Sequence, residues 1–173
     1  MIRFLLLIIA VMAFAYFLPA KPANHEASIE IDESREETWR ILADLSQLPR
    51  WNESMSIMEF VGSQKFGLGA MISVASVPVK RKLRVAEWIP YNQMTFRVET
   101  DPQVTSDHTI RYSVHPRAGG CLVRYAEEYR PSGGYLGTVL DKIYLTPVGA
   151  NGRDPALANL KRLVETGQGI FVP

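Results

Sequence analysis

The stretch "ILADLSQLPRWNESM", residues 41–55, leads from an amphipathic helical pattern into a proline and a tryptophan. Leu45, Leu48 and Trp51 recur every three residues, and Pro49 prevents one long continuous helix. We therefore predict a short helical turn that packs Trp51 against an apolar surface. After this stretch the hydrophobic period changes from 3.6 to 2, so the turn connects a helix to a sheet.

The segment before the turn predicts a strand followed at once by a helix. Residues 28–32, "SIEID", alternate isoleucine with polar residues, as a half-buried strand does. Ser34 and Glu37 have the spacing of a capping box, which marks the start of a helix. Trp39 and Leu42 then fall on one face of that helix.

The chain after the turn contains strand-like runs separated by turn signals. Consecutive strands with short links indicate an antiparallel meander. The runs span residues 56–61, 70–76, 80–88, 93–99, 106–114 and 121–129.

Helical patterns return after the meander. An apolar stripe predicts a helix over residues 132–145, which we expect the proline and glycines of residues 147–152 to interrupt. A last helix should then begin with Asp154 as its N-cap and Pro155 at its first position, and end at Gly167.

The first twenty residues, "MIRFLLLIIAVMAFAYFLPA", are almost entirely apolar after Arg3. As a helix, residues 4–20 would span about 25 Å, against about 30 Å for a hydrocarbon layer. Small residues are poorly placed for signal cleavage, so a retained transmembrane anchor is favoured over a cleaved signal peptide or a buried helix. The expected localisation is a single-pass membrane protein with an extracytoplasmic (periplasmic) domain, with an exported soluble protein as the alternative. Residues 21–27 then form a polar linker.

Size and charge limit the remaining functions. A chain of 173 residues fits one domain with a sizeable core. With 19 basic and 18 acidic residues, it lacks the concentrated positive charge that a nucleic-acid partner requires. The basic cluster "KRKLR", residues 80–84, fits a solvated sheet surface or contact with anionic lipid headgroups. Cys121 is the single cysteine and the three histidines are scattered, so we predict no metal site and no cofactor.

The order of strand, two small helices, meander and C-terminal helix resembles the SRPBCC superfamily. This is the helix-grip fold of START lipid-transfer domains and of bacterial "polyketide cyclase/dehydrase and lipid transport" proteins. The resemblance covers about residues 28–166 and implies an α+β fold in a membrane-anchored bacterial member. It implies a curved antiparallel sheet of about six to seven strands wrapped around a long C-terminal helix. The sequence itself predicts the preceding N-terminal hydrophobic helix and a C-terminal tail over residues 167–173. The resemblance rests on "EETWRILADLSQLPRWN" (36–52), "GSQKFGLGA" (62–70) and "LANLKRLVE" (157–165).

In that architecture the turn around Trp51 closes one end of an internal cavity between the sheet and the C-terminal helix. Strand alternation then indicates which side chains line the cavity, with Glu87 as a further candidate. The resulting wall is mostly apolar with a few hydroxyl and ionisable groups, as expected of a small-molecule site. The predicted ligand-binding residues are Leu48, Trp51, Leu83, Val85, Phe96, His108, Ile110, Tyr112, Val123, Tyr125 and Glu127.

We therefore expect the domain to bind, and by extension to transport or sequester, a hydrophobic or amphiphilic small molecule such as a lipid or quinone, next to a membrane. His108 and Glu127 could face each other and act as a general base, but hydrogen bonding near the strand ends is the favoured interpretation of the pair, ahead of ligand contact and of catalysis. No nucleophile with an evident base is present, so we assign no catalytic residue and favour a binding protein over an enzyme. The alternatives are a cyclase- or hydrolase-type enzyme using the same cavity, and a membrane-tethered interaction module with an unknown protein partner.

Overall fold

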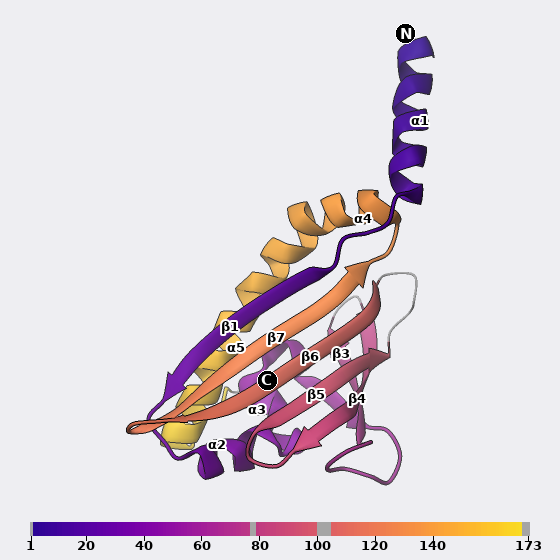
Figure 1. Ribbon diagram of the computed structural model, residues 1–173. Coiled ribbons are helices and arrows are strands. Elements are labelled where there is room, and N and C mark those ends of the chain that lie inside the picture. The colour runs from indigo at the N-terminus through magenta and orange to yellow at the C-terminus, as the bar shows by residue number, and fades with distance from the viewer. Residues whose placement is uncertain (1, 77–78, 100–104, 171–173) are drawn as a thin grey trace.

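The computed structural model describes residues 2–76, 79–99 and 105–170, and for some of these, including 144–154, the backbone alone. Within these ranges the chain forms a seven-stranded antiparallel sheet in the order β1-β7-β6-β5-β4-β3-β2 (Figure 1). The predicted α+β class and antiparallel meander are confirmed. The strands are β1 (Ala23–Ile31), β2 (Ile57–Phe60), β3 (Met71–Ser76), β4 (Val79–Ile89), β5 (Gln93–Glu99), β6 (Thr105–Arg117) and β7 (Gly120–Pro131).

The first strand is longer than the sequence pattern indicates, because β1 contains most of the predicted linker, residues 21–27. It pairs antiparallel with β7 along its whole length. In its first half, Ala23, His25 and Ala27 occupy the half-buried positions, and none of them is a large apolar residue. The linker prediction was therefore wrong, because pairing with β7 stabilises a strand whose own alternation is weak.

In Figure 1, α2 and α3 lie at one end of the sheet, α5 runs along β1 toward α4 at the other end, and α1 extends away from the domain. The α2 helix begins as predicted, because Ser34 Oγ accepts a hydrogen bond from the Glu37 N–H at 3.1 Å. The elements are α1 (Ile2–Phe17), α2 (Arg35–Leu42), η1 (Leu45–Gln47), α3 (Leu48–Trp51), η2 (Glu53–Met55), α4 (Gly134–Leu140), the π-helical η3 (Asp141–Leu145) and α5 (Thr146–Thr166).

The predicted interruption between the last two helices is absent from the described backbone. The η3 segment joins α4 directly to α5, and Pro155 lies inside α5 instead of at the start of a new helix. A proline removes one backbone donor and bends a helix, but packing on neighbouring elements can keep the helix continuous. Here α5 packs against β1, α2 and α3.

The N-terminal helix is too short for the role that we predicted. After α1 the chain turns toward α4, because the Leu18 carbonyl accepts from the Tyr135 N–H at 2.9 Å and the Lys21 N–H donates to Thr138 Oγ1 at 3.0 Å. A helix of 16 residues rises about 24 Å, less than the hydrocarbon thickness of about 30 Å. Among the described residues, no helix is long and apolar enough to cross a membrane. The predicted single-pass localisation is therefore wrong, and membrane attachment through this helix has no support.

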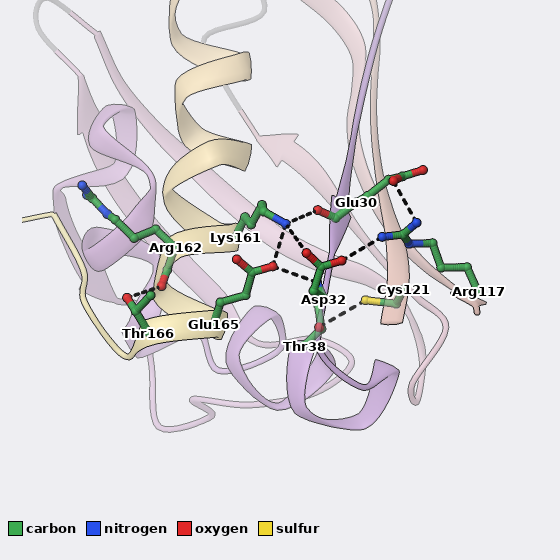
Figure 2. Close-up of polar contacts among 9 residues, drawn as sticks. All are labelled: Glu30, Asp32, Thr38, Arg117, Cys121, Lys161, Arg162, Glu165 and Thr166. Atoms are coloured by element: carbon green, nitrogen blue, oxygen red, sulfur yellow. Dashed lines mark hydrogen bonds and ion pairs between the residues drawn. The ribbon is translucent and has the colours of Figure 1, made fainter. Parts of the chain in front are cut away.

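A network of charged side chains fixes the end of α5 to the end of β1 (Figure 2). Lys161 Nζ donates to the Glu30 carbonyl at 2.9 Å and forms ion pairs with Glu165 at 2.6 Å and Asp32 at 3.3 Å. The Asp32 N–H in turn donates to Glu165 Oε1 at 2.7 Å. From the β6 side, Arg117 forms ion pairs with Glu30 at 2.8 Å and with Asp32 at 2.9 Å. The hydrogen bond with Glu165 raises the pKa of Lys161.

The hydrophobic core lies between the inner face of the sheet and α2, α3 and α5. Its largest fully buried side chains include Trp51, Phe96 and Tyr112. The described part of the predicted tail packs on α3, where the Ile170 N–H donates to the Arg50 carbonyl at 2.7 Å. Residues 171–173 of that tail, and Met1 of the predicted anchor, lie outside the described residues.

Candidate functional site

All the predicted ligand-binding side chains are buried, on α3 or on the inner face of β4 to β7. Whether they contact a ligand stays a prediction. Glu87 lies on the other face, because the register shifts between Val85 and Glu87 and reverses the alternation. Its carboxylate accepts hydrogen bonds from the side chains of Gln93 at 2.6 Å and Thr95 at 3.0 Å. The predicted set without Glu87 therefore forms one continuous inner surface.

The helical turns over residues 45–51 hold Trp51 in this surface. Asp44 caps η1 by accepting from the Ser46 N–H at 3.0 Å, and Pro49 stands in the first turn of α3, where its missing donor costs nothing. Leu48 and Trp51 then point inward and are fully buried. The predicted contact of Trp51 with an apolar surface is confirmed, since its ring lies 5.7 Å from that of Tyr112, edge to face.

The outer side of α3 borders a surface pocket of about 960 Å³. A second pocket, of about 500 Å³, lies where α2 begins, beside the turn between β6 and β7. The lining of the first consists of Pro49, Arg50, Arg162, Gly167, Gln168, Gly169 and Ile170. The α3 helix therefore separates this pocket from the buried surface that carries Trp51.

A buried acid–base pair stands at the opposite end of the inner surface. His108 Nε2 lies 2.8 Å from Glu127 Oε1, and the Tyr125 hydroxyl donates to Glu127 Oε2 at 2.9 Å. These side chains are 5%, 7% and 8% exposed, respectively. The predicted proximity of His108 and Glu127 is confirmed.

A β-bulge lies directly before His108, which keeps the inward alternation of Ile110 and Tyr112. The pairing of β6 with β7 shifts register between Ser106 and Thr109, and Asp107 has a φ of 52°. Asp is among the few non-glycine residues that adopt a left-handed conformation at moderate cost. Bulges of this kind redirect side chains and are frequent beside functional sites.

A second polar group adjoins the first, and the sequence interpretation missed two of its members. The Tyr129 hydroxyl donates to Asp141 Oδ1 at 2.5 Å, and His25 Nε2 lies 3.3 Å from the same hydroxyl. The ring of Tyr129 lies 5.2 Å from that of His108, which joins the two groups. Asp141 gave no usable signal, because in the predicted helix it lies on the face opposite the apolar stripe of residues 136, 139, 140 and 143. His25 gave no signal, because it lies in the segment interpreted as a linker.

Tyr112 connects Trp51 to these polar groups. Burial, and next the negative charge of Glu127, raise the pKa of Tyr112, while a hydrogen bond with the Asn52 side chain acts in the opposite direction. Its ring also contacts Tyr125, at 5.3 Å. Aromatic rings and polar groups therefore extend from α3 to η3 without a break.

The thiol of Cys121, a further reactive side chain, is not suited to catalysis. Cys121 is buried and its thiol donates to Thr38 Oγ1 at 3.2 Å. Burial raises the pKa of Cys121, which disfavours the nucleophilic thiolate. Within residues 2–76, 79–99 and 105–170, no three His, Cys, Asp or Glu side chains gather as metal ligands.

A seven-stranded antiparallel sheet, with short helices closing one end and α5 along one side, defines an α+β domain of the helix-grip type. The comparison with protein families gives the finer assignment. The chain belongs to the "Polyketide cyclase / dehydrase and lipid transport" family, whose model matches residues 22–165. The predicted superfamily is thereby confirmed, whereas a bacterial, membrane-anchored origin is not shown.

Solved structures of several functions share the fold at low sequence identity. Norcoclaurine synthase from Thalictrum flavum, solved with dopamine and hydroxybenzaldehyde, is 14% identical with a TM-score of 0.66, covering 87% of this chain and 90% of its own. The Aha1 dimer from Colwellia psychrerythraea is 16% identical with a TM-score of 0.63, covering 85% and 99%. The di-domain aromatase/cyclase StfQ of the steffimycin pathway is 11% identical with a TM-score of 0.68, covering 83% of this chain and 51% of its own. Among proteins with curated functions, none matches this sequence.

Proposed function

We propose that this domain binds a hydrophobic or amphiphilic small molecule, such as a lipid or a quinone, between the inner face of the sheet and α5. The observation that supports the proposal is the group His108, Glu127 and Tyr125 within a mostly apolar buried wall. Burying a carboxylate beside an imidazole is costly, and apolar residues of similar volume would stabilise a simple core better. Polar groups that converge in an apolar interior are typical of sites that orient a small molecule.

The relatives agree with this class of ligand. The family name includes lipid transport, and the norcoclaurine synthase complex contains two small aromatic molecules in a protein of the same fold. By analogy, the residues around Phe96, Tyr112 and Val123 would contact the apolar body of the ligand. A role in transport or sequestration would follow if the bound molecule exchanges slowly between the protein and its surroundings.

The test is to identify what the protein carries. Purified full-length protein is analysed by native mass spectrometry, and its organic extract by chromatography and mass spectrometry. We expect a bound small molecule, and Tyr125→Ala should change the retained species because it widens the inner surface. Arg124→Ala is the matched control, since Arg124 is exposed on the outer face of the same strand. Absence of any retained molecule, with Tyr125→Ala behaving like Arg124→Ala, would contradict the proposal.

The distance of 2.8 Å between His108 Nε2 and Glu127 Oε1 also favours a second candidate function, an enzyme of cyclase or hydrolase type. A carboxylate that orients an imidazole is the arrangement of a general base. Once a ligand is identified, its conversion by wild-type protein can be compared with that by His108→Ala and Glu127→Gln. His115→Ala is the control, because His115 contacts Ser113 and lies outside the inner surface. Equal conversion by all four proteins would remove the enzymatic role of the pair.

A further inference from the structure

Among the side chains that the structure describes, the indole of Trp51 is a buried donor on the inner surface without an acceptor. Trp51 is fully buried, and its indole Nε1 makes no hydrogen bond in the part of the chain that the structure describes. Buried side-chain donors are usually satisfied, because a donor taken out of water without a partner is unfavourable. A bound molecule would explain why this position is an indole.

The surroundings of Trp51 suggest the shape of such a molecule. Its ring stands at 90° to that of Tyr112, which in turn contacts Phe96 and Tyr125 edge to face. These rings form a continuous aromatic wall from α3 toward Glu127. Planar, unsaturated groups pack well against such walls, since aromatic pairs favour edge-to-face and offset contacts.

The charges of the interior restrict the polar end of the molecule. Among the described residues, no Lys or Arg side chain is buried, so an anionic headgroup would find no cation there. The nearest buried ionisable pair is Glu127 with His108, and the charge of Glu127 already acts on Tyr112. An anion beside Trp51 would therefore be desolvated without compensation.

We infer that the ligand is a neutral molecule with a flat apolar body and a carbonyl or similar acceptor oxygen that accepts the indole N–H of Trp51. This inference rests on the proposed binding function and makes it specific. It separates neutral carbonyl compounds from carboxylate lipids such as free fatty acids.

Three probes of similar shape test the inference on the full-length protein. They are 1-acetylnaphthalene, which has a carbonyl acceptor, 1-ethylnaphthalene, which has none, and the anion 1-naphthoate. Dissociation constants are measured by equilibrium dialysis, and the indole N–H resonances of the three tryptophans by ¹H–¹⁵N NMR. Trp51→Phe keeps a ring but removes the donor and assigns the Trp51 resonance. Trp88→Phe is the control, since Trp88 packs on Trp39 and Phe66 near the C-terminal end of β4.

We expect wild-type protein to bind the ketone about five-fold more tightly than the hydrocarbon, as for one neutral hydrogen bond, and the carboxylate at least about ten-fold more weakly than the ketone. Trp51→Phe should abolish the preference for the ketone over the hydrocarbon, and Trp88→Phe should keep it. In wild-type protein the ketone alone should move one of the three tryptophan indole protons downfield, and this observation needs no variant; Trp51→Phe then assigns the moved resonance.

Binding of the hydrocarbon and ketone with equal affinity, an unmoved Trp51 resonance, or tight binding of 1-naphthoate would overturn the inference and leave the proposed function intact. If a folded wild-type protein binds none of the probes but retains a small molecule in the mass-spectrometric test, the inference alone fails; if it also retains nothing, the proposed function itself fails.

Discussion

Replacing Glu127 by alanine tests whether the buried polar group is arranged as described. The carboxylate accepts from Tyr125 at 2.9 Å and lies 2.8 Å from His108, and all three side chains are buried. Removing it deletes both contacts, each worth about 1–3 kcal/mol when a buried group loses its partner. We expect a loss of about 3–5 kcal/mol in the free energy of unfolding, the usual cost of breaking a buried pair from one side. Glu127→Gln keeps the shape and one acceptor oxygen, so its cost should be about 1 kcal/mol.

The neighbouring residue provides the control. Glu128 is exposed on the outer face of β7, so Glu128→Ala should change stability by no more than about 0.5 kcal/mol. Urea unfolding monitored by circular dichroism, with the m-value compared across variants, gives these differences. If Glu127→Ala costs no more than Glu128→Ala, the two residues do not occupy opposite faces as described, and the reasoning about the site is refuted.

Three further predictions concern a buried hydroxyl, a close backbone contact and the charged network of Figure 2. Because the pKa of Tyr112 is raised, the folded protein keeps the phenol proton, while the unfolded chain releases it near pH 10. The stability that Tyr112 contributes is therefore complete below pH 10 and is lost as the pH rises toward the pKa of Tyr112 in the folded state. Urea unfolding from pH 8 to 11 should therefore show a shallower alkaline loss for Tyr112→Phe than for wild type, and no such change for the exposed Tyr135→Phe. Gly120→Ala should lower the free energy of unfolding by about 1–3 kcal/mol more than Gly119→Ala, because a Cβ at Gly120 would lie 2.1 Å from the Ile31 carbonyl oxygen, while a Cβ at Gly119 meets nothing within 4 Å. Equal thermal denaturation midpoints of the two variants would contradict this prediction. Lys161→Met should lower the free energy of unfolding by at most about 1 kcal/mol at low salt and by almost nothing in 1 M NaCl, because the ion-pair partners of Lys161 are partly exposed. A loss that does not depend on salt, or one equal to that of the exposed Lys82→Met, would refute an ionic role for Lys161.

The regular elements were predictable because their residues follow strong local rules. Ser34 and Glu37 mark the start of α2, and Pro49 limits the helical turn before Trp51. The strands of the meander show clear alternation, and each predicted run overlaps one of β2 to β7. Tertiary packing decided what the local pattern could not. Pairing with β7 makes a strand of residues 23–27, and packing keeps α5 continuous past Pro155.

The inner surface was predictable for the same reason, and its exceptions occur at irregularities of the backbone. Two-residue alternation placed Tyr112, Tyr125 and Glu127 correctly, but it assumes an unbroken register. The bulge between Val85 and Glu87 turns the Glu87 side chain to the outer face of the sheet, and nothing in the local sequence marks that bulge. The contribution of Asp141 depends on how η3 approaches β7, which is a long-range property that no local pattern contains.

The pairing of β1 with β7 has a consequence for how the chain folds during synthesis. The ribosome releases β1 early, yet its hydrogen-bonding partner is the last strand, about ninety residues later in the case of Ile31 and Cys121. Closing so long a loop is entropically expensive, and topologies rich in such distant pairings fold slowly. The nascent chain therefore exposes the isoleucines of β1 until β7 has left the ribosome, and co-translational chaperones would meet this segment before its partner strand exists.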